Sequence, residues 1–323
     1  MKGVEFIVFS DLHINIWSKF NKDNSRTLNN FGVLHDIVEV CNKYKVPAIF
    51  CGDLFHKPTG ISTELLEILD DEVEWLYNHM ERDIWAISGN HDIDKINTIK
   101  SPKYSLVKHL SNRLPRFKCI DFTNLYRGVN FKVFGVPYID HNTGLSEYLN
   151  SLELDSNAKN ILVLHTDYPG AKDTDGRLVD SVENLNLNIL NKFDLVLCGH
   201  IHKPQRLSKK VYMVGAPLQQ RRTDSKCELG YWLLYDDLSM EFKPLKSYPK
   251  FIDVEDAEDI KDDGNYYTIV PKTSRVKVNL NHKITKQLSK KSLAKKYMRE
   301  KGIKDNKKRD LLINVLNKAE KLC

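Results

Sequence analysis

The sequence predicts an α/β protein. Two observations support this: short apolar runs alternate with segments long enough for helices, and metal-binding side chains recur where most of those runs end. Strands that alternate with helices pair mostly in parallel, so their carboxyl ends meet at one edge. Open α/β sheets bind ligands at that edge. We therefore expect the polar residues that follow the apolar runs to share one site.

Five apolar runs are expected to be buried strands. They are Val4–Phe9, Val46–Cys51, Ile84–Ile87, Ile161–Leu164 and Leu195–Cys198. A helix is expected over residues 62–82, where apolar side chains recur at helical spacing. Its apolar stripe serves either the core of the chain or a contact between two copies of it.

The polar residues that follow these runs are those that bind hard or borderline divalent metals, through carboxylate, imidazole or amide oxygen. They are Asp11-Leu12-His13, Gly52-Asp53, Gly89-Asn90-His91-Asp92, His165 and Gly199-His200-Ile201-His202. Each alone has a structural explanation, since Gly-Asp pairs are common in turns and single histidines are common in cores. Their joint order along the chain predicts one centre that holds two metal ions.

The set of motifs resembles the calcineurin-like metallophosphoesterase superfamily, whose pattern is D-x-H, G-D, G-N-H-D/E, H and G-H-x-H. The pattern is complete over residues 4–202. The resemblance implies a metallophosphoesterase β-sandwich flanked by helices. It also implies one metal held by Asp11, His13, Asp53 and His202, and a second held by Asp53, Asn90, His165 and His200.

The resemblance further implies a role for each central residue. Asp53 would bridge the two ions, His91 would reach the phosphate, and Asp92 would orient His91. Two such ions, about 3.5–4 Å apart, clamp a phosphodiester and activate a water molecule near neutral pH. Mixed oxygen and nitrogen ligation without thiolates favours manganese or iron over a zinc-only cysteine site. The resemblance implies Mn²⁺ as the cofactor, with Mg²⁺, Fe²⁺ and Zn²⁺ as alternatives.

Other segments resemble one branch of that superfamily, which contains the nuclease subunit of the bacterial SbcCD complex and its phage counterparts. They are Cys51–His56, Gly135–Tyr138, Val214–Gln220 and Gly230–Trp232. The branch implies a double-strand exonuclease and single-strand endonuclease that processes DNA ends in recombination, repair or replication. It implies an SbcC-like coiled-coil ATPase partner and a homodimer. His56 stands where several relatives have Asp, and we interpret it as a loop residue rather than a group supporting the site.

Two other functions remain open on sequence grounds. One is a metallophosphoesterase that acts on a small-molecule phosphodiester or a phosphoprotein. The other is a scaffold that binds partners but has lost catalysis. The complete ligand set argues against the scaffold, and the Gly215-Ala-Pro-Leu-Gln-Gln segment argues against the small-molecule enzyme.

Three domains are expected from motifs and charge. Residues 1–239 form the nuclease domain and residues 282–323 a basic, amphipathic helical tail. Between them, residues 240–281 resemble the small α+β domain that caps DNA in relatives. Residues 270–323 hold 17 Lys or Arg against 4 Asp or Glu, whereas the whole chain has a net charge of +6. The tail binds either the ATPase partner or the protein body, and its charge either contacts DNA or faces solvent.

Composition indicates a soluble, cytoplasmic protein of 323 residues. No apolar stretch approaches the roughly 20 residues of a membrane helix, and the first residues lead directly into a strand. Six cysteines are scattered without a Cys-x-x-Cys pair, so we expect reduced thiols. Cys51 and Cys198, which precede the glycines of two metal motifs, are expected to be buried strand residues.

Overall fold

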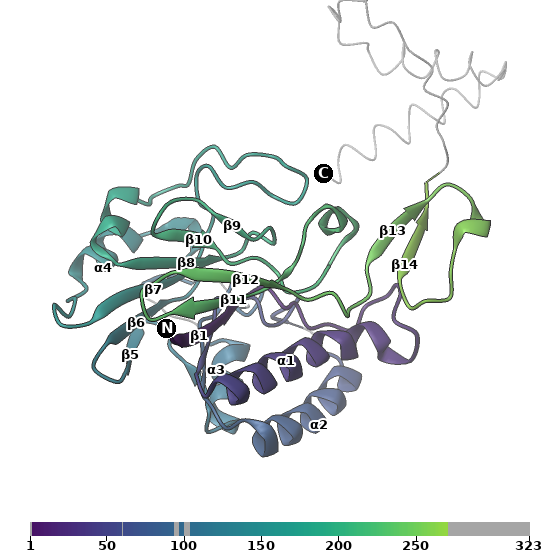
Figure 1. Ribbon diagram of the computed structural model, residues 1–323, viewed down its shortest axis with the longest axis horizontal. Helices are drawn as coiled ribbons and strands as arrows, with labels where there is room; N and C mark the ends of the chain where they lie inside the picture. The colour runs from purple at the N-terminus through teal and green to yellow at the C-terminus, as the bar shows by residue number, and fades with distance from the viewer. Residues whose placement is uncertain (1, 60, 94–96, 100–103, 271–323) are drawn as a thin grey trace, which may run out of the picture. The chain divides into compact units, whose positions relative to one another are not determined.

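Two six-stranded sheets pack face to face in the computed structural model, which describes residues 2–59, 61–93, 97–99 and 104–270 (Figure 1). The first sheet has the order β12 (Met240–Pro244), β11 (Gly230–Tyr235), β1 (Val4–Phe9), β2 (Ala48–Phe50), β3 (Ile84–Ala86), β4 (Phe117–Cys119). The second has the order β5 (Thr123–Arg127), β6 (Phe131–Val136), β7 (Lys159–His165), β8 (Leu195–Gly199), β10 (Val211–Met213), β9 (Gln205–Arg206). A separate parallel pair joins β13 (Phe251–Val254) to β14 (Tyr266–Ile269).

Parallel pairing runs through the centre of both sheets, as the sequence predicts. Strands β1 to β4 are parallel, and so are β6, β7, β8 and β10, with antiparallel strands only at the margins. The five predicted strands are all present, with ends shifted by up to two residues. They divide between two sheets instead of forming one continuous edge, which the alternation of strands and helices did not predict.

Helices cover the outer faces of the sandwich. The described α-helices are α1 (Ser25–Tyr44), α2 (Thr63–His79), α3 (Leu106–Arg113) and α4 (Leu145–Ser151). Five short 3₁₀ helices connect other elements: η1 (Lys22–Asn24), η2 (Asp140–Asn142), η3 (Leu187–Lys192), η4 (Arg222–Lys226) and η5 (Ala257–Asp259). Figure 1 shows α1 and α2 side by side on one outer face. The layers are therefore helix, sheet, sheet and helix.

Strand β1 shows how the sequence produces these layers. Phe6 and Val8 point into the core between the sheets, while Ile7 and Phe9 point into the core beneath α1 and α2. All four side chains are fully buried. A strand covered on both faces needs a continuous apolar run rather than alternation, and Phe6–Phe9 provides such a run.

Helix α2 confirms the predicted amphipathic segment and corrects its end. Ser62 caps it by accepting a hydrogen bond from the Leu65 N–H, and the helix ends at His79 instead of continuing to residue 82. Met80 already has extended backbone angles. Leu66 and Tyr77 remain exposed on this helix, so part of its apolar surface is outside the core.

Residues 240–244 complete the first sheet as its edge strand, beside β11. The predicted boundary at residue 239 therefore falls between two strands of one sheet, and the division into three domains stays a prediction. By internal contacts the chain separates into Met1–Pro271 and Lys272–Cys323. The predicted helical tail and residues 271–281 of the predicted small domain lie outside the described residues.

The cysteine prediction holds for the described residues, whose five cysteines are all free. Cys51 and Cys198 are buried, as expected for strand ends. In the part of the chain that the structure describes, no helix has the length and apolar character needed to cross a membrane.

Candidate metal centre

The predicted ligands stand at the C-terminal ends of five strands, three from the first sheet and two from the second. His165 is the last residue of β7, and the other ligands lie on tight loops that follow their strands. Asp11 and His13 follow β1 and Asp53 follows β2, with backbone φ angles of 53°, 51° and 61°. His200, after β8, has a φ of 89°. A left-handed backbone costs a non-glycine residue of order 1–3 kcal/mol and persists only where the surroundings enforce it. The fold therefore stores strain at the residues predicted to bind metal.

Glycines in the motifs allow these loops to approach one another. A Cβ atom on Gly89 would come within 2.1 Å of Asp53 Oδ1. A Cβ on Gly52, whose φ is 97°, would come within 2.5 Å of His165 Nδ1. Real Cβ atoms do not tolerate such distances, so any side chain at either position would push the ligand residues apart.

The first cluster consists of Asp11, His13 and His202, whose candidate ligand atoms all lie within 4.8 Å of one another. The Nε2 atoms of His13 and His202 are 3.0 Å apart. Asp11 and His13 are buried. The cluster therefore joins the end of β1 to the loop after β8 across the two sheets.

The second cluster consists of Asp53, His165 and His200. Asn90 adds an amide oxygen that lies 3.1 Å from His165 Nε2 and 3.0 Å from His200 Nδ1. Asp53 connects the clusters, because its Oδ2 lies 3.3 Å from His165 Nε2 and 3.6 Å from His13 Nε2. The structure thus brings all seven predicted ligands together, and their coordination of metal stays a prediction.

The charges at this centre fit a bound cation. Asp11 and Asp53 are almost completely buried, and neither pairs with a Lys or Arg among the described residues. Burial raises the pKa of Asp11, while burial lowers the pKa of His13. Burial also disfavours the charged form of His165, but the adjacent Asp53 carboxylate outweighs it and raises the His165 pKa to about 9. A divalent ion would replace that proton as the positive charge beside Asp53.

Polar neighbours outside the centre leave one nitrogen of His165, His202 and His200 facing it, through hydrogen bonds for the first two and an ion-pair contact for the third. The backbone oxygen of Cys51 lies 2.8 Å from His165 Nδ1, so Nε2 faces inward. Asp224 Oδ2 lies 3.3 Å from His202 Nδ1, which again leaves Nε2 for the centre. Asp167 is 3.6 Å from His200 Nε2 and leaves Nδ1. Fixing the far nitrogen sets both the tautomer and the ring orientation of a metal-binding histidine.

The hydrogen bonds of Asp92 go to backbone groups, and its predicted role in orienting His91 stays a prediction. Its carboxylate accepts hydrogen bonds from the backbone N–H groups of Asp53, Leu54, Phe55 and Gly89. The Nδ1 of His91 instead lies 2.6 Å from the backbone oxygen of His56. Burial and the nearby Asp53 charge raise the pKa of Asp92 to about 7, although hydrogen bonds from the backbone N–H groups act to lower it. Asp92 therefore fixes the loops that carry Asp53 and Gly89.

Two further residues belong to the site. His56, interpreted from sequence as a loop residue, forms a cluster with His13 and His91, and its ring stacks on that of His91 at 5.3 Å between centroids. Its place three residues after Asp53 was the available signal. Asp224 is fully buried beside His202. No motif marks Asp224, because only the folded structure brings η4 back to the loop after β8.

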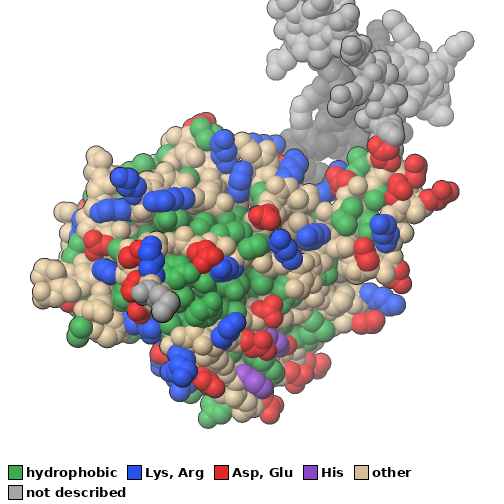
Figure 2. Space-filling model, in the orientation of Figure 1, with side chains coloured by type: hydrophobic (Ala, Val, Ile, Leu, Met, Phe, Trp, Pro, Cys, Tyr) green, Lys and Arg blue, Asp and Glu red, His purple; other side chains and the backbone are tan. Residues whose placement is uncertain are grey.

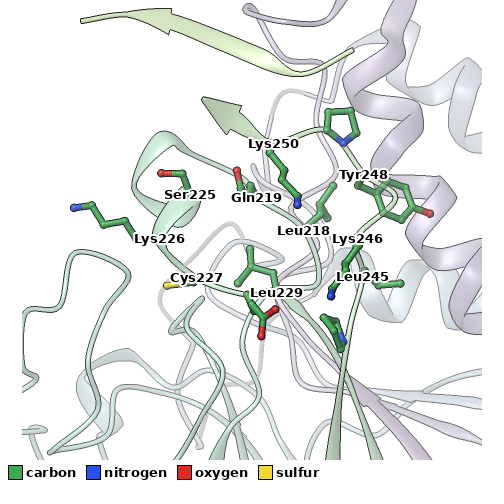
Figure 3. A pocket seen from close by; sticks show the side chains of 13 residues that line it. Leu218, Gln219, Ser225, Lys226, Cys227, Leu229, Leu245, Lys246, Tyr248 and Lys250 are labelled. Atoms are coloured by element: carbon green, nitrogen blue, oxygen red, sulfur yellow. The ribbon is translucent and has the colours of Figure 1, made fainter. Parts of the chain in front are cut away.

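A separate cavity of about 280 Å³ lies between η4 and the connection from β12 to β13, and no predicted metal ligand lines it. Figure 3 shows Lys246 and Lys250 bordering it, whereas Lys226 points away from both. Lys226 pairs with Asp175, while neither Lys246 nor Lys250 forms an ion pair with a described residue. The cavity is therefore distinct from the metal centre and carries two unpaired ammonium groups.

Comparison with known proteins agrees with this geometry. The family described as calcineurin-like phosphoesterase matches residues 4–204. The chain belongs to this family. The SbcD subunit of nuclease SbcCD from Staphylococcus epidermidis is 25% identical over an alignment of 263 residues. The alignment covers 72% of this chain and 66% of the relative. The crystal structure of TT1561 of Thermus thermophilus is 14% identical and covers 75% of this chain and 99% of its own, with a TM-score of 0.42.

Family membership assigns metal-dependent phosphoester hydrolysis to this chain, and the clusters at Asp11, Asp53 and their histidines are able to hold the metal. The chain spans just under two thirds of the length of the SbcD relative.

Mn²⁺ binding is expected to release about one proton or more per chain at pH 7.5. His165, with a pKa of about 9, is protonated at that pH and must lose the proton to become a ligand. Metal affinity should therefore rise with pH up to about pH 9. Proton release should disappear above that pH, because His165 is then already neutral. Titration calorimetry in two buffers of different ionisation enthalpy measures the release. A His79→Gln variant should behave like the parent, and release that is unchanged at pH 10 would contradict the assignment.

Asp92→Asn is expected to lower the free energy of unfolding by about 2–3 kcal/mol, because the amide group cannot accept all four backbone N–H groups. It should also weaken Mn²⁺ binding by displacing Asp53. His91→Ala, the comparison variant, should change neither quantity appreciably while lowering turnover by about 10²–10⁴-fold. Chemical denaturation and Mn²⁺ titration test both variants, and equal stability of Asp92→Asn and the parent would instead support a purely orienting role for Asp92.

Proposed function

We propose that the chain is a Mn²⁺-dependent DNA nuclease subunit, with exonuclease and endonuclease activity, that works with an SbcC-like ATPase on DNA ends. The observation that carries the proposal is the pair of clusters bridged by Asp53, with His91 beside them. The ions, when bound, would neutralise phosphate charge and lower the pKa of water. The 25% identical relative, named as a component of nuclease SbcCD, supports a nucleic-acid substrate.

His91 is suited to act on the leaving group. Its ring contacts His13 at 4.8 Å between centroids, and its Nδ1 is held by the His56 carbonyl. The remaining nitrogen, Nε2, is then available to give a proton to the departing sugar oxygen as the P–O bond breaks. The His91 backbone N–H donates to Asp53 Oδ1, so this histidine and the bridging carboxylate keep a fixed relative position.

The Gly-Ala-Pro-Leu-Gln-Gln segment has a structural role at this centre. Gln220 donates from Nε2 to the backbone oxygen of Leu12, which lies between Asp11 and His13. The backbone oxygen of Gln220 accepts a hydrogen bond from Arg26 on α1. The segment that distinguishes the SbcD branch in the sequence therefore supports the first metal loop directly.

On the face of the body drawn in Figure 2, positive charge does not form a continuous track for DNA. Lys and Arg side chains on that face are interspersed with Asp and Glu. The sequence puts the excess of positive charge in residues 270–323, outside the described residues. We propose that phosphate contacts come from the metals, from Lys246 and Lys250 beside the cavity, and from the tail. Homodimer formation through α2, where Tyr77 is exposed, is part of the same proposal.

Mn²⁺-dependent digestion of end-labelled duplex and single-stranded DNA tests the function. The parent chain should degrade both, and His91→Ala should lose about 10²–10⁴-fold in kcat, the usual contribution of a proton-transfer group. Hydrolysis of a small chromogenic phosphodiester without DNA cleavage would replace DNA by a small-molecule or phosphoprotein substrate. Failure to bind Mn²⁺ would instead support a non-catalytic scaffold.

Deletion of residues 284–323 tests the partner proposal. If the tail docks on the ATPase, the shortened chain should no longer be retained by the immobilised ATPase, because the segment predicted to be an amphipathic helix is gone. Its hydrolysis of a chromogenic phosphodiester should continue, since all predicted ligands precede residue 203. Retention equal to that of the full chain would show that the ATPase contacts the body instead.

A further inference from the structure

Four residues form a line of contacts from the small β13–β14 sheet to His91. Arg26, on α1, has its guanidinium carbon 3.9 Å from the centre of the Trp17 ring. Trp17 in turn contacts the His56 ring at 4.8 Å between centroids, and His56 stacks on His91 at an interplanar angle of 15°. Trp17 and Arg26 lie outside every metal motif, yet these contacts connect them to His91, the proposed proton donor.

Packing alone sets the orientation of the His56 ring. Its side chain forms no hydrogen bond to a described residue, and its buried Nδ1 has no partner there. The buried Nε1 of Trp17 likewise has no partner among these residues. Ring contacts are worth about 0.5–1.5 kcal/mol each, enough to hold one rotamer over others. Removing Trp17 would therefore leave the His56 ring free to turn and the His91 ring without its fixed neighbour.

Arg26 is itself held in place from several directions. It is buried, and it donates hydrogen bonds to the backbone oxygens of Lys19 and Gln220. Its guanidinium also lies 5.3 Å from the centre of the Phe251 ring on β13 and 5.6 Å from that of Tyr266 on β14. A desolvated cation over aromatic faces can contribute about 2 kcal/mol. Arg26 therefore ties Trp17 both to the small sheet and to the segment that supports Leu12.

We propose that Trp17 is a positioning residue for His91, acting through His56, and that Arg26 fixes Trp17 and connects the small β13–β14 sheet to the centre. The inference rests on the proposed function, in which His91 protonates the leaving oxygen. Misplacement of a reacting group by about 1 Å can cost about 10²-fold in rate. The Trp17–Arg26 contact thus adjusts turnover without touching substrate or metal.

Trp17→Leu is the decisive variant, and Trp17→Phe is its conservative partner. Leu should lower kcat about 10–100-fold with little change in KM or Mn²⁺ binding, because only the position of His91 changes. Phe keeps an aromatic face and removes no hydrogen bond among the described residues, so it should retain activity within about threefold. Equal kcat values for the parent and the Leu variant would overturn the inference.

A double-mutant cycle distinguishes an effect of Trp17 on the position of His91 from a general disturbance of the fold. Trp17→Leu added to His91→Ala should cause no further loss of kcat, because the residue through which Trp17 acts is already absent. Trp75→Leu is the matched control. Trp75 is also half-buried and stacks on two histidines, His35 and His79, on α1 and α2. That variant should keep full activity, and an additional loss in the His91→Ala background would contradict action through His91.

Nuclear magnetic resonance of the histidine rings tests the inference independently of activity. Trp17→Leu should shift the Cε1–H signals of His56 and His91, whereas Trp75→Leu should shift only those of His35 and His79. An unmoved His91 signal overturns the positioning role, whichever substrate the enzyme uses. If the His91 signal moves but the parent chain hydrolyses no DNA, the contact stands and the proposed substrate is wrong.

Discussion

The buried carboxylate of Asp53 is the group on which the rest of the centre depends. One of its oxygens faces His13 from the first sheet and His165 from the second, and the other accepts the backbone N–H of His91. A carboxylate so deeply buried needs positive charge beside it, which explains the raised pKa of His165 and the fit of a divalent ion. The two sheets therefore meet at a point where a bound cation is favourable.

The surrounding loops are arranged to hold Asp53 in a strained conformation. Asp92 gathers four backbone N–H groups around the Asp53 turn, and Gly52 and Gly89 leave the space that this turn requires. These contacts resist relaxation of the left-handed backbone at Asp53. Stability and site geometry thus depend on the same few hydrogen bonds, and Asp92 contributes by fixing backbone rather than by contacting His91.

The small β13–β14 sheet is connected to the centre by side chains rather than by strand pairing. Arg222 forms a bidentate pair with Asp253, and the Phe251 N–H donates to Gln219. Arg26 lies against Phe251 and Tyr266 from the other side. Through Gln219, Gln220 and Trp17, these contacts connect the small sheet to Leu12 and His56. A shift of the small sheet would therefore displace Leu12 and His56.

The sequence by itself determined the strands, the order of the metal-binding residues and the chemistry of their side chains, because apolar runs and ligand types are local properties. It correctly placed Val4–Phe9 as a strand and Ser62 as the start of a helix. The contacts of Asp92, His56, Asp224 and Trp17 were decided by tertiary structure alone. Each depends on which backbone groups and rings lie nearby after two sheets pack, and residues as far apart as His202 and Asp224 carry no shared pattern that reveals such contacts.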